Sequence, residues 1–215
     1  MTARFRLITM IAAATALAGC KSSGEIVIDQ GVGVTALRGV CPAVGIPEYT
    51  GDVTLFRGEA RTADAIDVVA AMTNVVTQCD DTTDKIYSTA SFEVLARRSD
   101  TRGARTVELP YFSTVLRGGS AVVSKRVGTI VLNFADGEER ARASGSAAAY
   151  IDRAEATLPP EIVEQINRKR RAGDLDAAVD PLTLPEVRTA LSRANFELLV
   201  GFQLTEAELA YNATR

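Results

Sequence analysis

The sequence predicts a mainly β protein: an antiparallel β-sandwich with a helical insertion before its last strand and a short C-terminal helix. Two observations lead to this fold class. Between residues 52 and 152, short β-branched runs are bounded by turn residues at fairly even spacing, which is the pattern of successive strands. After residue 153 the apolar periodicity becomes helical, and a strand pattern returns only at Phe196.

The strands are predicted in chain order. A first strand at residues 25–29 leads into a loop that carries Cys41, and further strands follow near 53–57, 65–79, 86–98, 108–116, 121–134 and 140–151. Gly118-Gly119 and Asp136-Gly137 each predict a hairpin turn. The alternation in the third of these later strands places the following residues on one face: Ile86, Ser88, Ala90, Phe92 and Val94. Six or seven strands over a hundred residues are typical of an immunoglobulin-like or fibronectin-like sandwich, but the chain has no Trp, so we expect likeness in architecture alone.

The helical insertion is predicted at about residues 159–194. One helix begins after Leu158-Pro159-Pro160-Glu161 and is closed by the basic run at residues 168–171, and a second begins at Pro185. The final strand, residues 196–204, is the most apolar run after the leader. Thr205 and Glu208 then form a capping box, which predicts a helix at the C-terminus.

The first 20 residues have the three parts of a secretory signal: a basic head, an apolar stretch from Leu7 to Leu17, and small residues before Cys20. The apolar stretch has 11 residues, too few to remain as a membrane-spanning helix. The run Leu17-Ala18-Gly19-Cys20 resembles the bacterial lipobox. This resemblance implies cleavage between Gly19 and Cys20, a diacylglycerol on the Cys20 thiol, and an acyl chain such as palmitate on the new amino group.

The resemblance also implies a location. We expect residues 1–19 to be the signal peptide, residues 20–24 a lipidated cysteine with a short tether, and residues 25–215 a single sandwich domain with its helical insertion. Lys21 follows the cysteine, and in enterobacterial lipoproteins Asp at this position retains the protein in the inner membrane, so the periplasmic face of the outer membrane is favoured over the cell membrane. The segments 200–205 and 209–212 resemble the tail of uncharacterised lipoproteins from alphaproteobacteria, a resemblance that carries no known activity.

Charge and cysteines restrict the partners and the compartment. The leader holds two of the 24 basic residues and none of the 27 acidic ones, so the mature chain has a formal net charge of −5. That balance argues against a nucleic-acid partner. In an oxidising compartment, Cys41 and Cys79 can pair and close a loop of about 38 residues, although two buried free thiols are the alternative.

The composition removes several kinds of chemistry. The chain has no histidine, which excludes Ser-His-Asp and Cys-His catalysis and the usual zinc sites. Clustered carboxylates stand at Asp80, Asp81 and Asp84, where calcium is one interpretation and ordinary turn chemistry the favoured one. A second cluster, Asp136 with Glu138 and Glu139, is interpreted as a solvated turn rather than an acid–base pair. The basic run at 168–171 could bind lipid phosphate, but the favoured interpretation is a set of solvated charges at a helix C-terminus. The glycosylation sequon at Asn212 is interpreted as a chance match.

We therefore expect a lipid-anchored, non-enzymatic cell-envelope protein with a structural or protein-interaction role. No catalytic residue, metal ligand, cofactor or small-molecule substrate is identified, and the partners expected are the membrane, through the lipid on Cys20, and another envelope protein. Two alternatives stay open. One is an enzyme that acts on peptidoglycan or glycan with carboxylates alone, which requires a cleft between facing acids. The other is a carrier of lipid or lipopolysaccharide, which requires an apolar cavity between the sheets.

Overall fold

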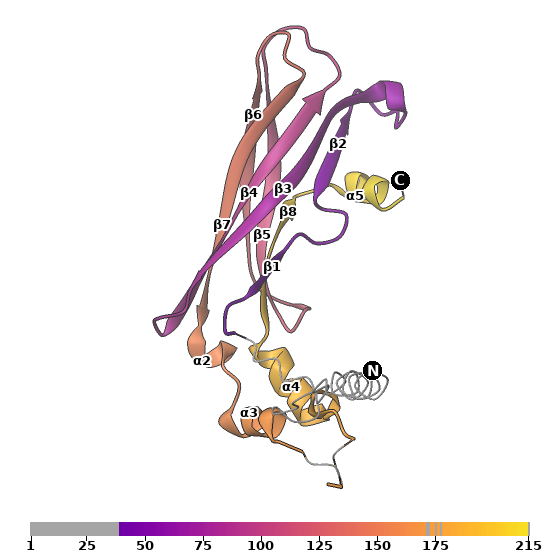
Figure 1. Cartoon of the computed structure of the whole chain (residues 1–215). Helices are drawn as coiled ribbons and strands as arrows, with labels where there is room; N and C mark the ends of the chain where they lie inside the picture. The colour runs from indigo at the N-terminus through magenta and orange to yellow at the C-terminus, as the bar shows by residue number, and fades with distance from the viewer. Residues whose placement is uncertain (1–38, 171–172, 175, 177, 215) are drawn as a thin grey trace, which may run out of the picture. The chain divides into compact units, whose positions relative to one another are not determined.

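Two four-stranded sheets form the sandwich in the computed structural model, which describes residues 39–170, 173–174, 176 and 178–214. Their order is β1-β8-β5-β6 in sheet A and β2-β3-β4-β7 in sheet B (Figure 1). The strands are β1 (Ala43–Gly45), β2 (Asp52–Phe56), β3 (Ile66–Asp80), β4 (Lys85–Arg98), β5 (Arg105–Arg117), β6 (Ala121–Phe134), β7 (Arg140–Asp152) and β8 (Phe196–Phe202). The sandwich predicted from the sequence is therefore present.

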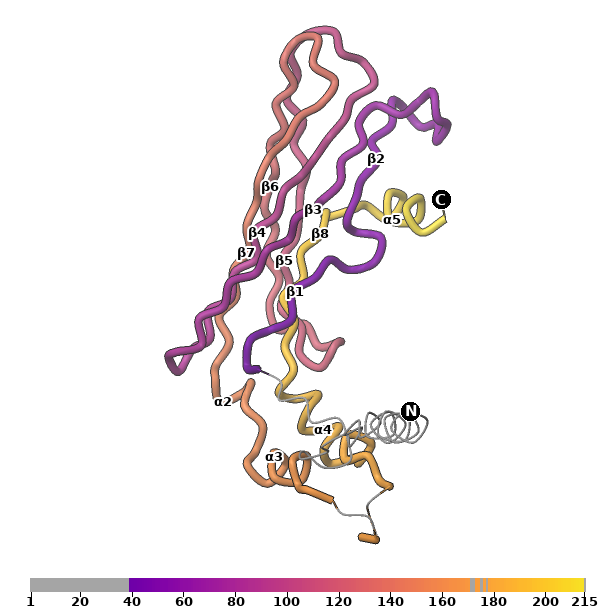
Figure 2. Tube along the Cα trace, viewed as in Figure 1, coloured from indigo at the N-terminus to yellow at the C-terminus, as the bar shows by residue number. Residues whose placement is uncertain are grey.

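The strand bounds agree closely with those read from the periodicity of the sequence. The predicted inward face of β4 is buried, because alternate side chains of a strand point to opposite sides and this set packs between the sheets. The structure adds β1, in a segment predicted as loop, which pairs in parallel with the C-terminal strand β8 (Figure 2). The strand predicted at residues 25–29 lies outside the described residues.

The order of strands within each sheet differs from that of an immunoglobulin constant domain. Three consecutive strands, β2, β3 and β4, lie side by side in sheet B, whereas an immunoglobulin constant domain moves to its second sheet after two. The Gly118-Gly119 turn joins the hairpin β5–β6, as predicted. The hairpin predicted at Asp136-Gly137 is wrong, because this turn carries the chain from β6 in sheet A to β7 in sheet B. Residues 136 and 137 do form a turn, as predicted. Hydrogen bonds from Arg98 and Gly103 hold this turn at the end of the sandwich, where the chain passes from one sheet to the other.

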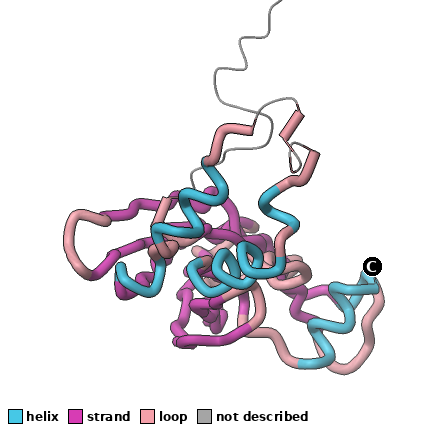
Figure 3. The backbone as a smooth tube through the Cα atoms, turned by 90° about the horizontal axis from the view of Figure 1, so that it is seen from below, coloured by secondary structure: helices cyan, strands magenta, loops and turns pink. Residues whose placement is uncertain are grey.

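Helices gather at one end of the sandwich (Figure 3). They are α2 (Arg153–Ala156), α3 (Pro160–Asn167) and α4 (Pro185–Ala194), with a short 3-10 helix, η3 (Pro181–Thr183), before α4. Val187 of α4 is fully buried against Ile162 and Ile166 of α3. The backbone N–H of Gly118 donates to the carbonyl of Asn195 after α4, which fixes this helix to the β5–β6 turn. None of the helices in the described part of the chain has the length and apolar character needed to cross a bilayer.

The C-terminal helix α5 (Glu206–Thr214) begins at the predicted capping box. Glu208 accepts hydrogen bonds from the backbone N–H and the hydroxyl of Thr205, each at 2.8 Å, and the Thr205 hydroxyl accepts from the Glu208 N–H. The reciprocal bonds satisfy donors that the first turn of a helix leaves unpaired. Asn212, 6% exposed, then donates from its amide to the carbonyls of Tyr49 and Asp52, both at 2.8 Å. Asn212, the first residue of the sequon, therefore connects helix α5 to the loop before β2.

Candidate functional site: an arginine-rimmed groove on sheet B

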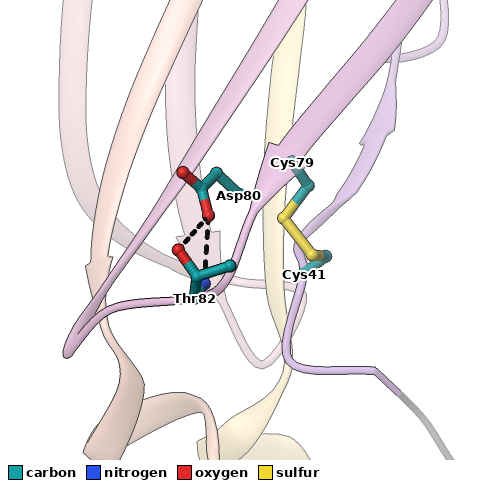
Figure 4. The surroundings of a disulfide bond; sticks show 4 residues. All are labelled: Cys41, Cys79, Asp80 and Thr82. Carbon is teal, nitrogen blue, oxygen red and sulfur yellow. Dashed lines mark hydrogen bonds between the residues drawn. A yellow bond between two sulfur atoms is a disulfide. The ribbon is translucent and has the colours of Figure 1, made fainter.

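The cysteine pair predicted from the sequence is present. The sulfur atoms of Cys41 and Cys79 are 2.01 Å apart, which joins the segment before β1 in sheet A to the end of β3 in sheet B (Figure 4). Cys79 lies opposite Ser88 in the β3–β4 ladder. The disulfide thus fixes one end of the sandwich, where the described chain begins. The predicted cleavage and lipidation positions, Gly19 and Cys20, lie outside the described residues.

The first acidic cluster is part of a turn. Asp80 accepts hydrogen bonds from the hydroxyl of Thr82 at 2.7 Å and from its backbone N–H at 3.0 Å (Figure 4). These two bonds hold the pKa of the Asp80 carboxyl below its usual value. Within the described residues, no group of three or more Cys, Asp or Glu side chains is arranged to hold a metal ion.

The second acidic cluster belongs to the far end of the sandwich, around the buried Arg98. Asp136 accepts from the backbone N–H of Gly103 at 2.6 Å, and Glu139 accepts from Nε of Arg97 at 2.5 Å. Glu138 contributes its backbone carbonyl to Arg98. The structure therefore places these three residues in separate loop and strand contacts and does not bring their carboxyl groups together as an acid–base pair.

The basic run lies in residues 168–179, which form a unit separate from the sandwich. Helix α3 ends at Asn167, so Arg168 and Arg170 follow the helix rather than close it. Arg168 is paired with Asp176, and Nε of Arg170 lies 3.5 Å from the same carboxylate. Both side chains therefore contact a carboxylate of their own segment.

The site that the sequence did not predict is an open groove of about 890 Å³ on the outer face of sheet B. Its floor is formed by small and apolar side chains of β3 and β4, including Val69, Ala71 and the 43% exposed Leu95. Arg97 of β4 and Arg140 and Arg142 of β7 form one rim. Arg57 and the two acids Asp64 and Asp67 lie on the opposite side.

The register of the sheet explains why three arginines meet. Arg97 lies directly opposite Arg140, and Arg142 lies directly opposite Leu95, all on the outward face. Side chains that face each other in this way have Cβ atoms about 4.5–5.5 Å apart, and like charges in such pairs are destabilising. Arg97 and Arg140 therefore place two like charges side by side, and the carboxylate of Glu139 pairs with Arg97.

Most of the donor capacity of these arginines is unused. Arg97 donates a hydrogen bond from Nε to Glu139. Nη1 of Arg142 lies 3.7 Å from a carboxylate oxygen of Glu93, beyond hydrogen-bonding distance. The side chain of Arg140 makes no hydrogen bond or ion pair with any other residue in the described part of the chain. Since a guanidinium carries five N–H donors in a planar fork, the rim can bind carboxylate or phosphate oxygens in a bidentate manner.

The Asp67 carboxyl of the groove is held in an ion pair and is not arranged for proton transfer. Arg105 donates to both oxygens of Asp67, at 2.8 and 2.6 Å, and these bonds hold the pKa of the Asp67 carboxyl below its usual value. The neighbouring Asp100 is bonded to Arg102 and its pKa is lowered as well. Both carboxyl groups stay ionised near neutral pH, so neither is a proton donor there.

The sequence did carry a signal for this groove. Arg140 and Arg142 are two residues apart in a predicted strand, which places them on one face, and Arg97 stands in another predicted strand with exposed alternate positions. What the sequence lacked was the pairing of β4 with β7, which are separated by the whole β5–β6 hairpin. Fold and groove together define a disulfide-bonded β-sandwich with an arginine-rimmed groove on one face. The chain matches no protein-family model, no curated protein and no solved structure.

Proposed function

We propose that the protein is a lipid-anchored, non-enzymatic component of the cell envelope that binds another envelope component at the periplasmic face of the outer membrane. The disulfide between Cys41 and Cys79 is the structural observation that carries the proposal. Disulfides form and persist in oxidising compartments such as the periplasm. The run Leu17-Ala18-Gly19-Cys20, which resembles a lipobox, directs the chain to the same compartment.

Side chains fill the space between the two sheets, which supports binding of a partner on the outer surface of the sandwich. Phe92, Phe134 and Phe202, each at most 2% exposed, belong to a buried cluster to which both sheets contribute. Side chains of this size occupy the space in which a carrier would hold its lipid. A partner is therefore expected on the outside of the sandwich, where the groove of sheet B offers unused hydrogen-bond donors.

The two alternative functions gain no support from the described residues. Each carboxyl whose pKa shift is resolved, Asp67, Asp80, Asp100 and Glu186, is shifted downward. A general acid needs the opposite shift, towards the working pH. Two acids, Asp64 and Asp67, do line the groove, but both oxygens of Asp67 accept hydrogen bonds from Arg105.

The mass of the mature protein tests the anchor. The protein is isolated from the membranes of its native host, and its intact mass is measured with and without reduction and alkylation. We expect a chain that begins at Cys20 and carries the added mass of acyl chains, with a two-dalton shift on reduction of the disulfide. A chain that begins elsewhere and carries no lipid would overturn the proposed anchoring.

Two variants separate the anchor from the disulfide. Cys20→Ser should abolish the acyl mass and leave the protein uncleaved or released from membranes. The double variant Cys41→Ser/Cys79→Ser should keep the acyl mass and lose the two-dalton shift. Acyl mass that persists in Cys20→Ser would place the lipid on another residue.

A further inference from the structure

We infer that the groove on sheet B binds an extended acidic segment of a protein partner, with carboxylates of alternate residues on Arg140 and Arg142. This inference deepens the proposed function, on which it rests, by naming the chemistry of the envelope partner. It follows from the spacing of the arginines, the apolar floor and the net charge of the rim.

The spacing of the charges matches a polypeptide. Arg140 and Arg142 are two residues apart on β7 and face outward, so their Cα atoms are separated by about 6.6–6.8 Å. Alternate side chains of an extended peptide have the same repeat. Arg97, opposite Arg140, adds a second guanidinium on one of the two positions. A peptide with acidic residues at i and i+2 thus places one carboxylate between Arg97 and Arg140 and the next on Arg142.

The floor of the groove fits the rest of such a segment. Leu95 lies between Ala71 on β3 and Arg142 on β7 in one row of the sheet, and it is 43% exposed. An apolar side chain of the partner can cover Leu95 beside the carboxylates. Purely ionic ligands, such as inorganic phosphate, leave this apolar surface in water and gain nothing from it.

The acids near the groove do not neutralise it. Asp67 is held by Arg105, and Glu139 and Glu93 each face one rim arginine and leave its remaining N–H donors unused. Asp64 lies across the groove, next to Arg57, which donates to the Asp64 carbonyl. The Arg140 guanidinium adds a positive charge that is in ion-pair contact with no carboxylate of the described residues. The rim therefore keeps a net positive charge on a chain whose formal net charge is −3.

The groove lies far from the disulfide along the sandwich. Arg97 is nine residues beyond Ser88 along β4, and Ser88 lies opposite the disulfide-bonded Cys79. At about 3.3 Å per residue, the groove is roughly 30 Å from the end of the sandwich at which the described chain begins. The groove and the disulfide therefore lie near opposite ends of the β3–β4 ladder.

The experiment measures binding of a defined probe to the full chain purified from its host in a neutral detergent. The probe is a fluorescein-labelled hexapeptide of alternating Glu and Val, and the matched probe has Gln in place of Glu. We expect fluorescence anisotropy to show at least tenfold tighter binding of the Glu peptide. The triple variant Arg97→Gln/Arg140→Gln/Arg142→Gln should lose at least tenfold in affinity, and higher salt should weaken binding to the native chain.

Controls make each outcome informative. Arg126→Gln removes an exposed arginine of sheet A and should leave binding unchanged. Thermal unfolding should show that the triple variant folds, since it removes the opposed charges of Arg97 and Arg140. Equal loss of affinity in Arg126→Gln, or equal binding of the two peptides, would overturn the inference. Arginine-dependent binding to phosphatidylglycerol vesicles without peptide binding would overturn it in favour of a lipid surface. Peptide binding does not depend on acylation, so failure of the proposed anchor is scored separately by mass.

Discussion

The ring of Tyr111 on sheet A meets the ring of Phe92 on sheet B edge to face, with centroids 5.2 Å apart. Each ring lies over a glycine directly opposite it in its own sheet, Gly128 for Tyr111 and Gly145 for Phe92. The Tyr111 hydroxyl then donates to the carbonyl of Ser146 on β7 at 3.0 Å. Two aromatic–glycine pairs therefore join the sheets in the middle of the sandwich, where a glycine leaves the space that each ring fills.

The two glycines should not tolerate a side chain. A Cβ on Gly128 would lie 2.5 Å from the Tyr111 ring, and one on Gly145 would lie 2.4 Å from the Phe92 ring. We expect Gly128→Ala and Gly145→Ala each to lower the free energy of unfolding by about 1–3 kcal/mol through overpacking. Urea denaturation with the disulfide intact measures this. Gly45→Ala, where the nearest atom is 3.8 Å away, is the control. Equal effects at all three sites would show that the ring contacts are unimportant.

Local sequence patterns predicted the strands but not their partners. The alternation of β4 and the capping box at Thr205 act between neighbours in the chain, so both could be read from the sequence. The turn at Asp136-Gly137 was recognised as a turn, yet the change of sheet depends on contacts with loop 99–104, which is distant in sequence. The arginine groove was missed for the same reason, because only the pairing of β4 with β7 brings Arg97 and Arg140 together.

The buried Arg98 should contribute strongly to the stability of the end of the sandwich that is distant from the disulfide. Arg98 is 1% exposed. Its guanidinium donates hydrogen bonds of 2.7–2.8 Å to the carbonyls of four residues: Glu138, Gly103, Thr101 and Ala135. These carbonyls come from the two loops that change sheet. We expect Arg98→Met to lower the free energy of unfolding by more than about 3 kcal/mol, since bonds from a charged donor are strong and their acceptors are left unpaired.

Two further variants sharpen the test of Arg98. Arg98→Lys should also destabilise the protein strongly, because one ammonium cannot reproduce the planar fork that reaches four carbonyls. Arg97→Met, on the exposed neighbour with one carboxylate partner, should change stability by less than about 1 kcal/mol. Urea denaturation of the three variants compares these values. A stability of Arg98→Lys close to that of the native chain would rule out the role of the fork.

The disulfide should stabilise the fold by restricting the unfolded chain. Cys41 and Cys79 close a loop with a sequence separation of 38, for which the chain-entropy model gives about 4 kcal/mol. We expect Cys41→Ala/Cys79→Ala to lose roughly this much in urea denaturation, and reductant to destabilise the native chain by a similar amount. Reductant should leave the double variant unchanged. A double variant as stable as the oxidised native chain would contradict this expectation.

Asp67 and Arg105 should make stability depend on pH in the acidic range. Hydrogen bonds from Arg105 hold the pKa of Asp67 below its usual value in the folded protein, while in the unfolded chain it returns to about 3.9. Between these two pKa values the unfolded state binds more protons, so the free energy of unfolding rises with pH. The contribution of Asp67 is complete above the unfolded pKa and is lost as pH falls through the folded pKa.

The variant Asp67→Asn removes this titration. Urea denaturation between about pH 5 and pH 2.5 should therefore show a smaller fall in stability than in the native chain, while Asp80 and Asp100, whose pKa values are also lowered, keep part of the dependence in both. Arg105→Gln should flatten the profile to a similar extent, because it removes the donor that lowers the Asp67 pKa. Asp81→Asn, in the exposed β3–β4 turn, is the matched control and should preserve the native slope. If Asp67→Asn and Asp81→Asn gave the same profile, the Asp67–Arg105 pair would not be the source of the acid dependence.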